Sequence, residues 1–395
     1  MGKEEVIEGS IWVPEPGLRA FTVAVLRRLG VPAADAKVAA DVLMAADLRG
    51  IGSHGVARLP RYVTGIKGGS IVPKGSSRTV KQTRATALVD GGNGLGQVVA
   101  RRGMELAIRK ARQTAVGFVA VRNSNHFGIA GYYSMMALKA GMIGLASTNA
   151  APLVVPTFGR TAVLGTNPIS VAVPTGGDEP FVLDMATSVV PRGTIEVYDR
   201  QAKEMPHGWA VDTTGHSTTK PRAVLEALAK RLGGGILPLG GEGEEFSGHK
   251  GYGLALLVDI LCGALPGAAT GLDVYADEDA ANVGHFFGAI DVRAFRPLNA
   301  FKRDMDKLLR TLRDSPKAQG HDHIYVHGEK SFAMERERRA KGIPLGPKVV
   351  ESLRKISGDT GVQWIAYCDT RARGGGLWGW TRGLQGRPPP APTLQ

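Results

Sequence analysis

A histidine lies in a polar turn between a short apolar run and a stretch without helix breakers. Residues 116–121 are apolar and rich in β-branched side chains, which predicts a buried strand, and residues 132–139 predict a helix. The turn at 122–128 contains His126. Side chains that follow a strand are held on a rigid base, and an imidazole exchanges protons near neutral pH. His126 is therefore a candidate acid or base, and a histidine that only packs under the following helix is the alternative.

A second group of polar residues follows residue 48. If a helix resumes at Ser53 as its N-cap, His54, Arg58 and Tyr62 lie four residues apart on one face. Pro60 fits such a helix only within its first turns or at a kink. A guanidinium is the natural two-pronged partner of a carboxylate. The face therefore predicts a site for a carboxylate ligand, with a solvated polar surface as the alternative.

Two other segments carry charged side chains at the ends of predicted elements. Asp184 follows the predicted strand at 181–183, where it could orient a histidine or cap the next helix. Lys250 lies between glycines at the start of an apolar helix over 254–265. Backbone amides and an ammonium group act together on an anion there, so the segment is a candidate phosphate or carboxylate site, although it lacks the spacing of a P-loop.

A glycine-rich turn at 92–96 imitates a dinucleotide-binding fingerprint. It joins a predicted strand at 85–91 to a predicted helix at 97–113. Its glycine spacing is not GxGxxG, and the next strand ends without an acidic residue for a ribose. This pattern argues against a Rossmann fold, so a dinucleotide that binds this chain must bind in another way.

Composition restricts the class of protein. The chain has 395 residues, 43% of them hydrophobic, and 54 glycines, which suits a loop-rich α/β protein of two or three domains. Only two cysteines occur, Cys262 and Cys368, and neither belongs to a CxxC motif, so a reducing cytoplasm is expected. The acidic N-terminus does not resemble a signal peptide, and the apolar stretch at 254–265 is too short to cross a bilayer. A soluble protein without a membrane partner is expected.

The net charge of +13 raises the possibility of nucleic-acid binding. Most basic residues are scattered among acidic ones, however, and no RNA-binding aromatic strand or zinc finger occurs. The charge also suits an enzyme that binds an anionic substrate and a pyrophosphate-containing cofactor. His321, His323 and His327 lack a frame of further ligands, so a surface loop is expected there and no metal site.

The remaining pattern predicts alternating helices and short strands. Helices are expected over 17–29, 33–49, 221–232, 298–313, 328–342 and 347–357, and strands over 142–146, 162–164, 169–173, 181–183 and 285–296. From about residue 363 the glycines and prolines predict a disordered tail.

Several motifs occur in one order along the chain: Gly52-Ser53-His54-Gly55 with Arg58 and Tyr62, then the segments 123–128, 164–168, 183–188, 248–253 and 328–330. Together they resemble the second, non-Rossmann malate/lactate dehydrogenase family. That family also contains ureidoglycolate, sulfolactate, diketogulonate and piperideine-carboxylate oxidoreductases. The resemblance covers about residues 16 to 362. The segments 188–191, 284–287 and 327–331 most resemble the malate dehydrogenases of thermophilic archaea.

The resemblance implies an α/β (α+β) fold that is not a Rossmann fold. A helical domain is built from both chain ends, and a central cofactor domain surrounds a largely antiparallel sheet. The expected boundaries are 1–75 for the N-terminal helical part, 76–296 for the central region, 297–362 for the returning C-terminal helices and 363–395 for the tail. Family members are homodimers, so a homodimer or larger homo-oligomer is expected, with the site in the cleft between domains.

The resemblance also implies an activity. It predicts reversible NAD(P)-dependent hydride transfer between (S)-malate and oxaloacetate, in the cytoplasm, with NAD or NADP as cofactor. The alternatives within the family are another 2-hydroxy acid or an imino acid, such as lactate, sulfolactate or ureidoglycolate. The alternative of a different class is a non-catalytic, basic nucleic-acid-binding protein.

Roles follow for the matching positions. The hydride leaves C2 as the hydroxyl proton goes to a base, and His126 is favoured as that base, with His54 close behind. Asp184 supports the site electrostatically, and Arg58 binds the C1 carboxylate with help from Ser53 and Tyr62. Cofactor contacts are expected at Val182, Leu183, Asp184, Met185, Ala186, Thr187, Ser188, His249, Lys250, Gly328, Glu329 and Lys330. One departure is Gly193-Thr194, where relatives usually carry Gly-Lys.

Overall fold

The computed structural model describes residues 6, 8–177, 179–277 and 279–364. The tail expected from about residue 363 therefore lies, from residue 365 on, outside the described residues. Its helices are α1 (Glu15–Arg28), α2 (Ala33–Leu48), α3 (Leu59–Lys67), α4 (Gly96–Thr114), α5 (Ala130–Met136), α6 (Arg192–Arg200), α7 (Pro221–Lys230), α8 (Gly248–Asp259), α9 (Leu298–Asp314), α10 (Glu329–Lys341) and α11 (Pro347–Thr360). Its strands are β1 (Ile11–Val13), β2 (Arg78–Gln82), β3 (Thr86–Asp90), β4 (Val116–Ser124), β5 (Met142–Thr148), β6 (Ile169–Val173), β7 (Phe181–Met185), β8 (Ala210–Val211), β9 (Gly235–Ile236), β10 (Val283–Asp291) and β11 (Ile343–Leu345).

The central sheet has seven strands in the order β2-β3-β4-β10-β5-β6-β7. Only β3 and β4 run parallel, and the other neighbours are antiparallel, so the expected largely antiparallel sheet is confirmed. β10 comes late in the chain yet lies between β4 and β5, with His285 opposite Val121 on one side and Thr148 on the other. Most residues of β10 are buried there, which agrees with its mostly apolar sequence.

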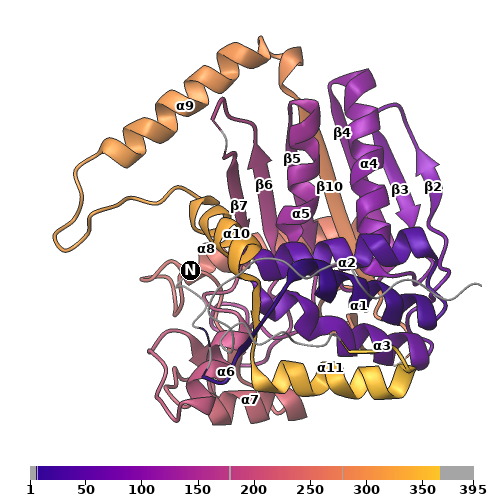
Figure 1. Ribbon diagram of the computed structural model, residues 1–395. Helices are drawn as coiled ribbons and strands as arrows, with labels where there is room; N and C mark the ends of the chain where they lie inside the picture. The colour runs from indigo at the N-terminus through magenta and orange to yellow at the C-terminus, as the bar shows by residue number, and fades with distance from the viewer. Residues whose placement is uncertain (1–5, 7, 178, 278, 365–395) are drawn as a thin grey trace, which may run out of the picture. The chain divides into compact units, whose positions relative to one another are not determined.

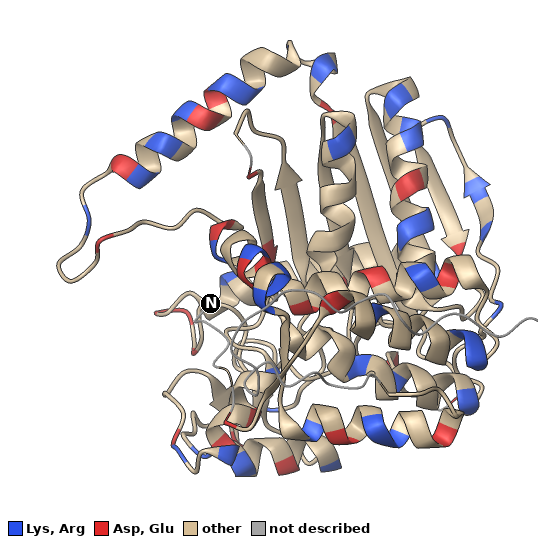
Figure 2. Ribbon diagram, viewed as in Figure 1, with Lys and Arg blue, Asp and Glu red and all other residues tan. Residues whose placement is uncertain are grey.

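α4 and α5 cover the face of the sheet that Figure 1 presents to the viewer. α4 packs on β4 and β10, and α5 packs on β5 and β6. The core between them includes Met104, Val121, Tyr133 and Phe287, all fully buried. Charged residues are gathered on the helices, and the inner strands are largely free of them (Figure 2). The sheet is therefore a rigid platform from which the loops at its lower edge in Figure 1 project.

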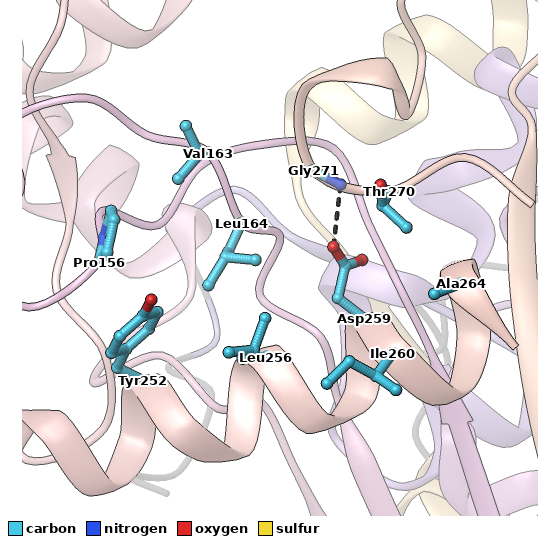
Figure 3. A pocket seen from close by; sticks show the side chains of 10 residues that line it. All are labelled: Pro156, Val163, Leu164, Tyr252, Leu256, Asp259, Ile260, Ala264, Thr270 and Gly271. Carbon is cyan, nitrogen blue, oxygen red and sulfur yellow. Dashed lines mark hydrogen bonds between the residues drawn. The ribbon is translucent and has the colours of Figure 1, made fainter.

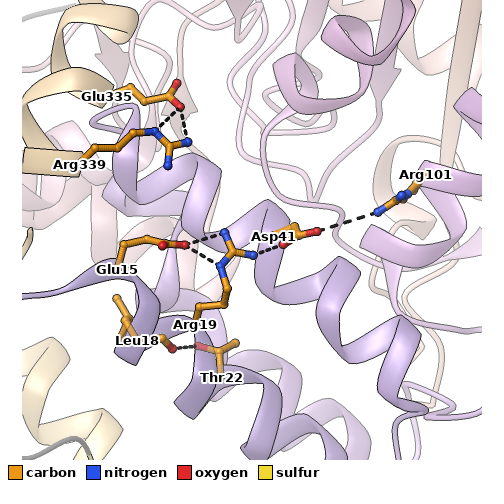
Figure 4. A network of polar contacts seen from close by, with 8 residues as sticks. All are labelled: Glu15, Leu18, Arg19, Thr22, Asp41, Arg101, Glu335 and Arg339. Atoms are coloured by element: carbon orange, nitrogen blue, oxygen red, sulfur yellow. Dashed lines mark hydrogen bonds and ion pairs between the residues drawn. The ribbon is translucent and has the colours of Figure 1, made fainter. Parts of the chain in front are cut away.

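Residues 11–28 and 343–360, from the N-terminal and C-terminal parts of the described chain, lie side by side. β1 pairs with β11, with Ile11 opposite Leu345, and α11 packs on α1 and α3. Arg19 on α1 pairs with Glu15 and with Asp41 on α2 (Figure 4). Arg101 on α4 reaches the other oxygen of Asp41 at 4.0 Å, which links these helices to the face of the sheet. The helix boundaries agree with the pattern, because Gly30 and Pro32 separate α1 from α2 as expected.

Several expected elements differ from the structure. Residues 162–164 form only an isolated bridge, from Leu164 to Val154, and not a strand. The predicted strand 285–296 ends at Asp291, because the Asp291 carboxylate accepts a hydrogen bond from the backbone N–H of Arg293 and caps a 3₁₀ turn. α6 has no counterpart among the expected helices. Ile195 is its only fully buried residue, so the segment lacks the repeated apolar positions by which a helix is predicted. Among the described residues, every helix is too short or too polar to span a bilayer.

Candidate active site

The segment after α2 does not form the helix that the sequence predicts from Ser53. Residues Gly52–His54 and Val56–Arg58 are 3₁₀ turns, and α3 begins only at Leu59, with Pro60 in its first turn. Pro is favoured at a helix start because its missing N–H would have no partner there. The expected single face bearing His54, Arg58 and Tyr62 is therefore wrong, although the side chains still meet.

Asp47, buried near the end of α2, shapes these turns. Its Oδ2 accepts a hydrogen bond from the backbone N–H of Val56 at 2.7 Å. Gly55 passes so close that a Cβ atom built on it would lie 1.8 Å from Asp47 Oδ1. Only glycine allows this approach, and it directs the turns that carry Ser53, His54 and Arg58 toward the sheet.

His54, Tyr62 and His126 converge. The rings of His54 and His126 stack with centroids 5.5 Å apart and planes inclined by 25°. The Tyr62 hydroxyl lies 2.8 Å from Nδ1 of His126, and the Ser53 hydroxyl lies 2.9 Å from Nδ1 of His54. The structure thus brings together four residues that the sequence predicts for one site. Each imidazole has a hydroxyl at Nδ1, so in both rings Nε2 is the nitrogen available for proton exchange.

The electrostatic surroundings keep both imidazoles neutral at pH 7. Burial, together with the positive charges of Arg58 and Arg61, lowers the pKa of His54 to about 4. Burial also holds the pKa of His126 well below its usual range, with added repulsion from His54 and the same two arginines. Burial raises the pKa of Tyr62, so its hydroxyl stays protonated. A neutral imidazole is the form that accepts a proton.

Arg58 and Arg61 bring two positive charges to this site. The Arg58 Nε donates to the backbone oxygen of Ser53 at 2.6 Å, and burial lowers the pKa of Arg58. In the part of the chain that the structure describes, neither arginine forms an ion pair with a carboxylate. Glu196 on α6 is near enough to act on Arg58, but its carboxylate pairs with Arg192 at 3.0 Å. The site is therefore electropositive.

Sequence reasoning missed three further residues of this site. The guanidinium carbon of Arg61 lies 4.7 Å from the ring centroid of Tyr275, whose hydroxyl interacts with the backbone of His126. The fully buried side chain of Gln97 lies near the Tyr62 hydroxyl. Arg61 is visible beside Tyr62 in the sequence, but Tyr275 lies in a polar loop with no pattern of its own, and Gln97 resembles an ordinary helix residue.

A third histidine, His285 on β10, lies directly beneath the loop that carries His126. It is fully buried, with Nε2 2.8 Å from the Ser124 hydroxyl and Nδ1 2.8 Å from the Thr148 hydroxyl. Its ring stacks on Phe127 with centroids 4.7 Å apart. Burial lowers its pKa to about 3. With both nitrogens occupied, His285 supports the loop and is not free to exchange protons with a ligand.

Asp184 contacts the backbone and not a histidine. Its Oδ2 accepts a hydrogen bond from the backbone N–H of Gly131 at 2.7 Å, at the start of α5. Burial raises its pKa to about 6, against the opposing effect of the Arg49 charge. Since both histidine Nδ1 atoms have other partners, the idea that Asp184 fixes a histidine tautomer is not supported. Asp184 instead fixes the helix that follows the His126 loop.

The segments expected to contact the cofactor lie side by side. At one end of the 182–188 segment, the backbone N–H of Val182 donates to the carbonyl of His327 at 3.1 Å, next to the start of α10. At the other end, the backbone N–H of Leu239 donates to the carbonyl of Thr187 at 2.8 Å, and Leu239 packs against Gly251 of α8. Two helix N-termini thus flank this segment, an arrangement that favours a pyrophosphate.

The charged residues at the starts of α8 and α10 differ in whether they are free to contact a ligand. His249, Lys250 and Lys330 are exposed. The carboxylate of Glu329, by contrast, is occupied, because it accepts hydrogen bonds from the backbone N–H of Val326 at 2.6 Å and from Arg313 at 3.1 Å. The exposed cations suit a phosphate-bearing group, whereas Glu329 holds the start of α10.

A cavity of about 350 Å³ lies beside α8 and is lined mainly by apolar side chains such as Leu164, Leu256 and Ile260 (Figure 3). Its carboxylate, Asp259, accepts hydrogen bonds from the backbone N–H of Gly271 at 2.9 Å and from Asn149 at 3.2 Å. The cavity is lined by none of the residues that the sequence predicts for the active site. Over the described residues, no group of three or more His, Cys, Asp or Glu side chains could hold a metal ion.

Known proteins resemble this chain over most of its length. Residues 13–354 match the profile of the malate/L-lactate dehydrogenase family. Malate dehydrogenase of Pyrococcus horikoshii is 49% identical over 92% of this chain and 99% of its own. The solved structure of that protein superposes with a TM-score of 0.84, at 46% identity, over 91% of this chain and 99% of its own.

More distant relatives have other names. Malate/(S)-sulfolactate dehydrogenase of Methanothermus fervidus is 40% identical over 87% of this chain and 97% of its own. Ureidoglycolate dehydrogenase (NAD(+)) of Escherichia coli O157:H7 is 33% identical over 83% of this chain and 90% of its own. These relatives all carry the name of a dehydrogenase, and they differ in the acid that the name specifies.

Proposed function

Because the chain belongs to the malate/L-lactate dehydrogenase family, and is therefore a dehydrogenase of hydroxy acids, we propose that it interconverts (S)-malate and oxaloacetate. The observation that carries this proposal is the pair of neutral imidazoles, His54 and His126, beside two guanidinium groups without carboxylate partners. A base and an anion-binding group are what oxidation of a 2-hydroxy acid requires. A non-catalytic nucleic-acid-binding protein is not supported, since the matching relatives are named as enzymes.

In this mechanism, Nε2 of His126 accepts the hydroxyl proton of the substrate as C2 is oxidised, and returns it in the reverse reaction. Tyr62 holds the ring through Nδ1. Arg58 binds the C1 carboxylate, with Ser53 and Tyr62 beside it, and His54 is the second candidate for the proton transfer. Asp184 supports the site through the Gly131 amide.

A nicotinamide cofactor, NAD or NADP, accepts or supplies the hydride when it is bound. The segment 182–188 would hold it, together with His249, Lys250 and residues 328–330. The fit rests on the two helix N-termini beside that segment and on the exposed Lys250 and Lys330, which favour a pyrophosphate.

A second candidate substrate is a sulfonated analogue, because the relative from Methanothermus fervidus is named for both malate and (S)-sulfolactate. A sulfonate and a carboxylate present the same negative charge to a guanidinium. Lactate, ureidoglycolate and imino acids are further candidate substrates within the family.

We also propose a homodimer in the cytoplasm. Leu254, Leu256 and Leu257 on α8 and Ile260 directly after it are exposed, and an apolar helix face of this kind is typical of a subunit interface. The cytoplasmic location rests on the use of only two cysteines. Light scattering at micromolar concentration tests the dimer, and Leu257→Asp is expected to weaken it.

The decisive experiment measures oxidation of NADH and NADPH at 340 nm with oxaloacetate, pyruvate, a sulfonated 2-oxo acid and a cyclic imine. The highest kcat/KM is expected with oxaloacetate. A higher value with another acid would keep the family but reject malate as the substrate. The ratio of the NADH and NADPH rates measures the cofactor preference directly.

A further inference from the structure

We propose that Arg61 is a specificity residue that binds the second anionic group of the substrate, so that the site selects 2-hydroxy acids with two negative charges. This inference rests on the proposed function, because it concerns the same reaction centre. It assigns a role to a residue that the sequence pattern left without one.

Arg61 acts on the same groups as Arg58. The charges of both arginines lower the pKa of His54 and of His126, and both act on Tyr62. Two guanidinium groups therefore lie around one imidazole pair. Arg58 alone accounts for the C1 carboxylate that every 2-hydroxy acid carries, so Arg61 is an additional positive charge at the centre.

This positive charge is not neutralised by the protein. None of the described carboxylates forms an ion pair with Arg58 or Arg61, whereas the neighbouring Arg192 pairs with Glu196. The two imidazoles near the arginines are neutral at pH 7, so they neither add to nor cancel this positive charge. Both guanidinium groups are exposed, and two accessible cations without carboxylate partners match a ligand with two negative charges.

Arg61 is also held in place. Its guanidinium lies over the face of Tyr275, and the Tyr275 hydroxyl interacts with the backbone of His126. Tyr275 has a φ of 59°, a conformation that bulky residues rarely adopt, in a loop whose Gly271 N–H is bound by Asp259. The loop thus fixes the position of Arg61 relative to the histidine, as a specificity residue requires.

The structure of the ligand suits two cations on either side of one acid–base group. In a four-carbon 2-hydroxy diacid, the two anionic groups lie on either side of the C2 hydroxyl. The proposal assigns the C1 carboxylate to Arg58, the hydroxyl to Nε2 of His126, and the terminal carboxylate or sulfonate to Arg61. A monocarboxylic acid leaves Arg61 without a partner.

The test compares wild type with Arg61→Met and Arg61→Lys, using oxaloacetate and pyruvate at saturating cofactor. For Arg61→Met, kcat/KM for oxaloacetate is expected to fall about 100-fold, the loss typical of a charge-assisted, two-pronged contact. The value for pyruvate is expected to change less than about threefold, and Arg61→Lys is expected to recover part of the loss, because it restores the charge without the planar fork. Arg84→Met, on an exposed turn, is the matched control and is expected to leave both values unchanged.

The outcomes separate the two proposals. Wild type that does not reduce oxaloacetate would reject the proposed function. Wild type that reduces oxaloacetate, with Arg61→Met lowering kcat/KM for both substrates by the same factor, would overturn the role of Arg61 alone. If Arg61→Met does not fold, as judged by its melting temperature, the ratio of the two kcat/KM values in Arg61→Lys decides in the same way.

Discussion

The hydroxyl of Tyr62 lies 2.8 Å from Nδ1 of His126, although the two residues belong to different parts of the fold, α3 and the loop after β4. Tyr62 is fully buried, and burial raises its pKa, so it remains a neutral hydroxyl throughout the working range. The pairing orients the imidazole and leaves Nε2 as the nitrogen that can reach a ligand.

Replacing Tyr62 with Phe tests that pairing. The ring keeps its packing, but His126 loses a hydrogen bond of about 1 kcal/mol, and its orientation is less restricted. We expect kcat to fall by roughly tenfold with a smaller change in KM. Steady-state kinetics with oxaloacetate measures both. An unchanged kcat would show that Nδ1 needs no partner for turnover.

The two stacked histidines, His126 and His54, are expected to contribute unequally to kcat. Loss of a general acid or base lowers kcat by about 10² to 10⁴, and His126→Ala is expected to fall in that range. His54→Ala is expected to have a smaller effect, because His54 contributes chiefly by packing on the ring of His126. His216→Ala, at an exposed histidine, is the control. Near-normal turnover in both site variants would refute the proposed mechanism.

The lowered histidine pKa values predict an unusual pH profile for malate oxidation. The pKa of His54 is about 4 and that of His126 lies well below 6.5, so both imidazoles stay neutral as the pH falls through 6.5. We expect kcat/KM to fall less than about threefold between pH 8 and 5.5, whereas a base with the ordinary pKa of about 6.5 would lose about tenfold. A decline centred near pH 6.5 would mean that the base is not desolvated.

His285 predicts a pH dependence of stability. Its pKa is about 3 in the folded chain and about 6.5 when unfolded, so the unfolded state alone binds the proton as the pH falls below 6.5. The free energy of unfolding is expected to fall by about 3 kcal/mol between pH 6.5 and 4 on this account.

His285→Gln keeps a donor and an acceptor but does not titrate. The difference in unfolding free energy between wild type and this variant, measured by urea denaturation at several pH values, isolates the contribution of His285. Two curves that run parallel from pH 7 to 4 would contradict the assignment.

Gly55 is expected to tolerate no side chain. A Cβ atom there would lie 1.8 Å from the carboxylate of Asp47, so Gly55→Ala must displace the turn that carries His54. We expect a loss of more than about 2 kcal/mol in unfolding free energy, together with a loss of activity. Gly358→Ala is the matched control, since a Cβ atom on Gly358 in α11 meets nothing within 4 Å. Helix propensity predicts a gain of about 0.5 to 1 kcal/mol for that control.

Local pattern was enough to predict most helices and the inner strands. The breakers Gly30 and Pro32 mark the junction of α1 and α2, and the apolar run before His126 became β4. His126 itself could be singled out because a polar turn after a buried strand is a common position for a reactive side chain. The proximity of His54 to His126 came from the family resemblance, because no spacing rule links residues so far apart.

The errors arose where tertiary contacts override local preference. The turns at 52–58 follow from the contact of Gly55 with Asp47, which no helical periodicity indicates. Tyr275 reaches Arg61 from a polar loop, and that contact depends on the whole fold. His285 could be located only after β10 was found between β4 and β5, because strand order does not follow chain order here.

The central position of β10 has a consequence for the order in which the chain can fold. β4 and β5 cannot reach their final neighbours until residue 291 has left the ribosome, since β10 separates them in the sheet. The loop that carries His126 rests on His285. A truncated chain that ends before β10 has no His285, so nothing supports its His126 loop from below. Contacts between such distant segments are formed slowly, because a long stretch of chain must first be closed into a loop. Catalytic competence is therefore one of the last properties that this chain acquires during its synthesis.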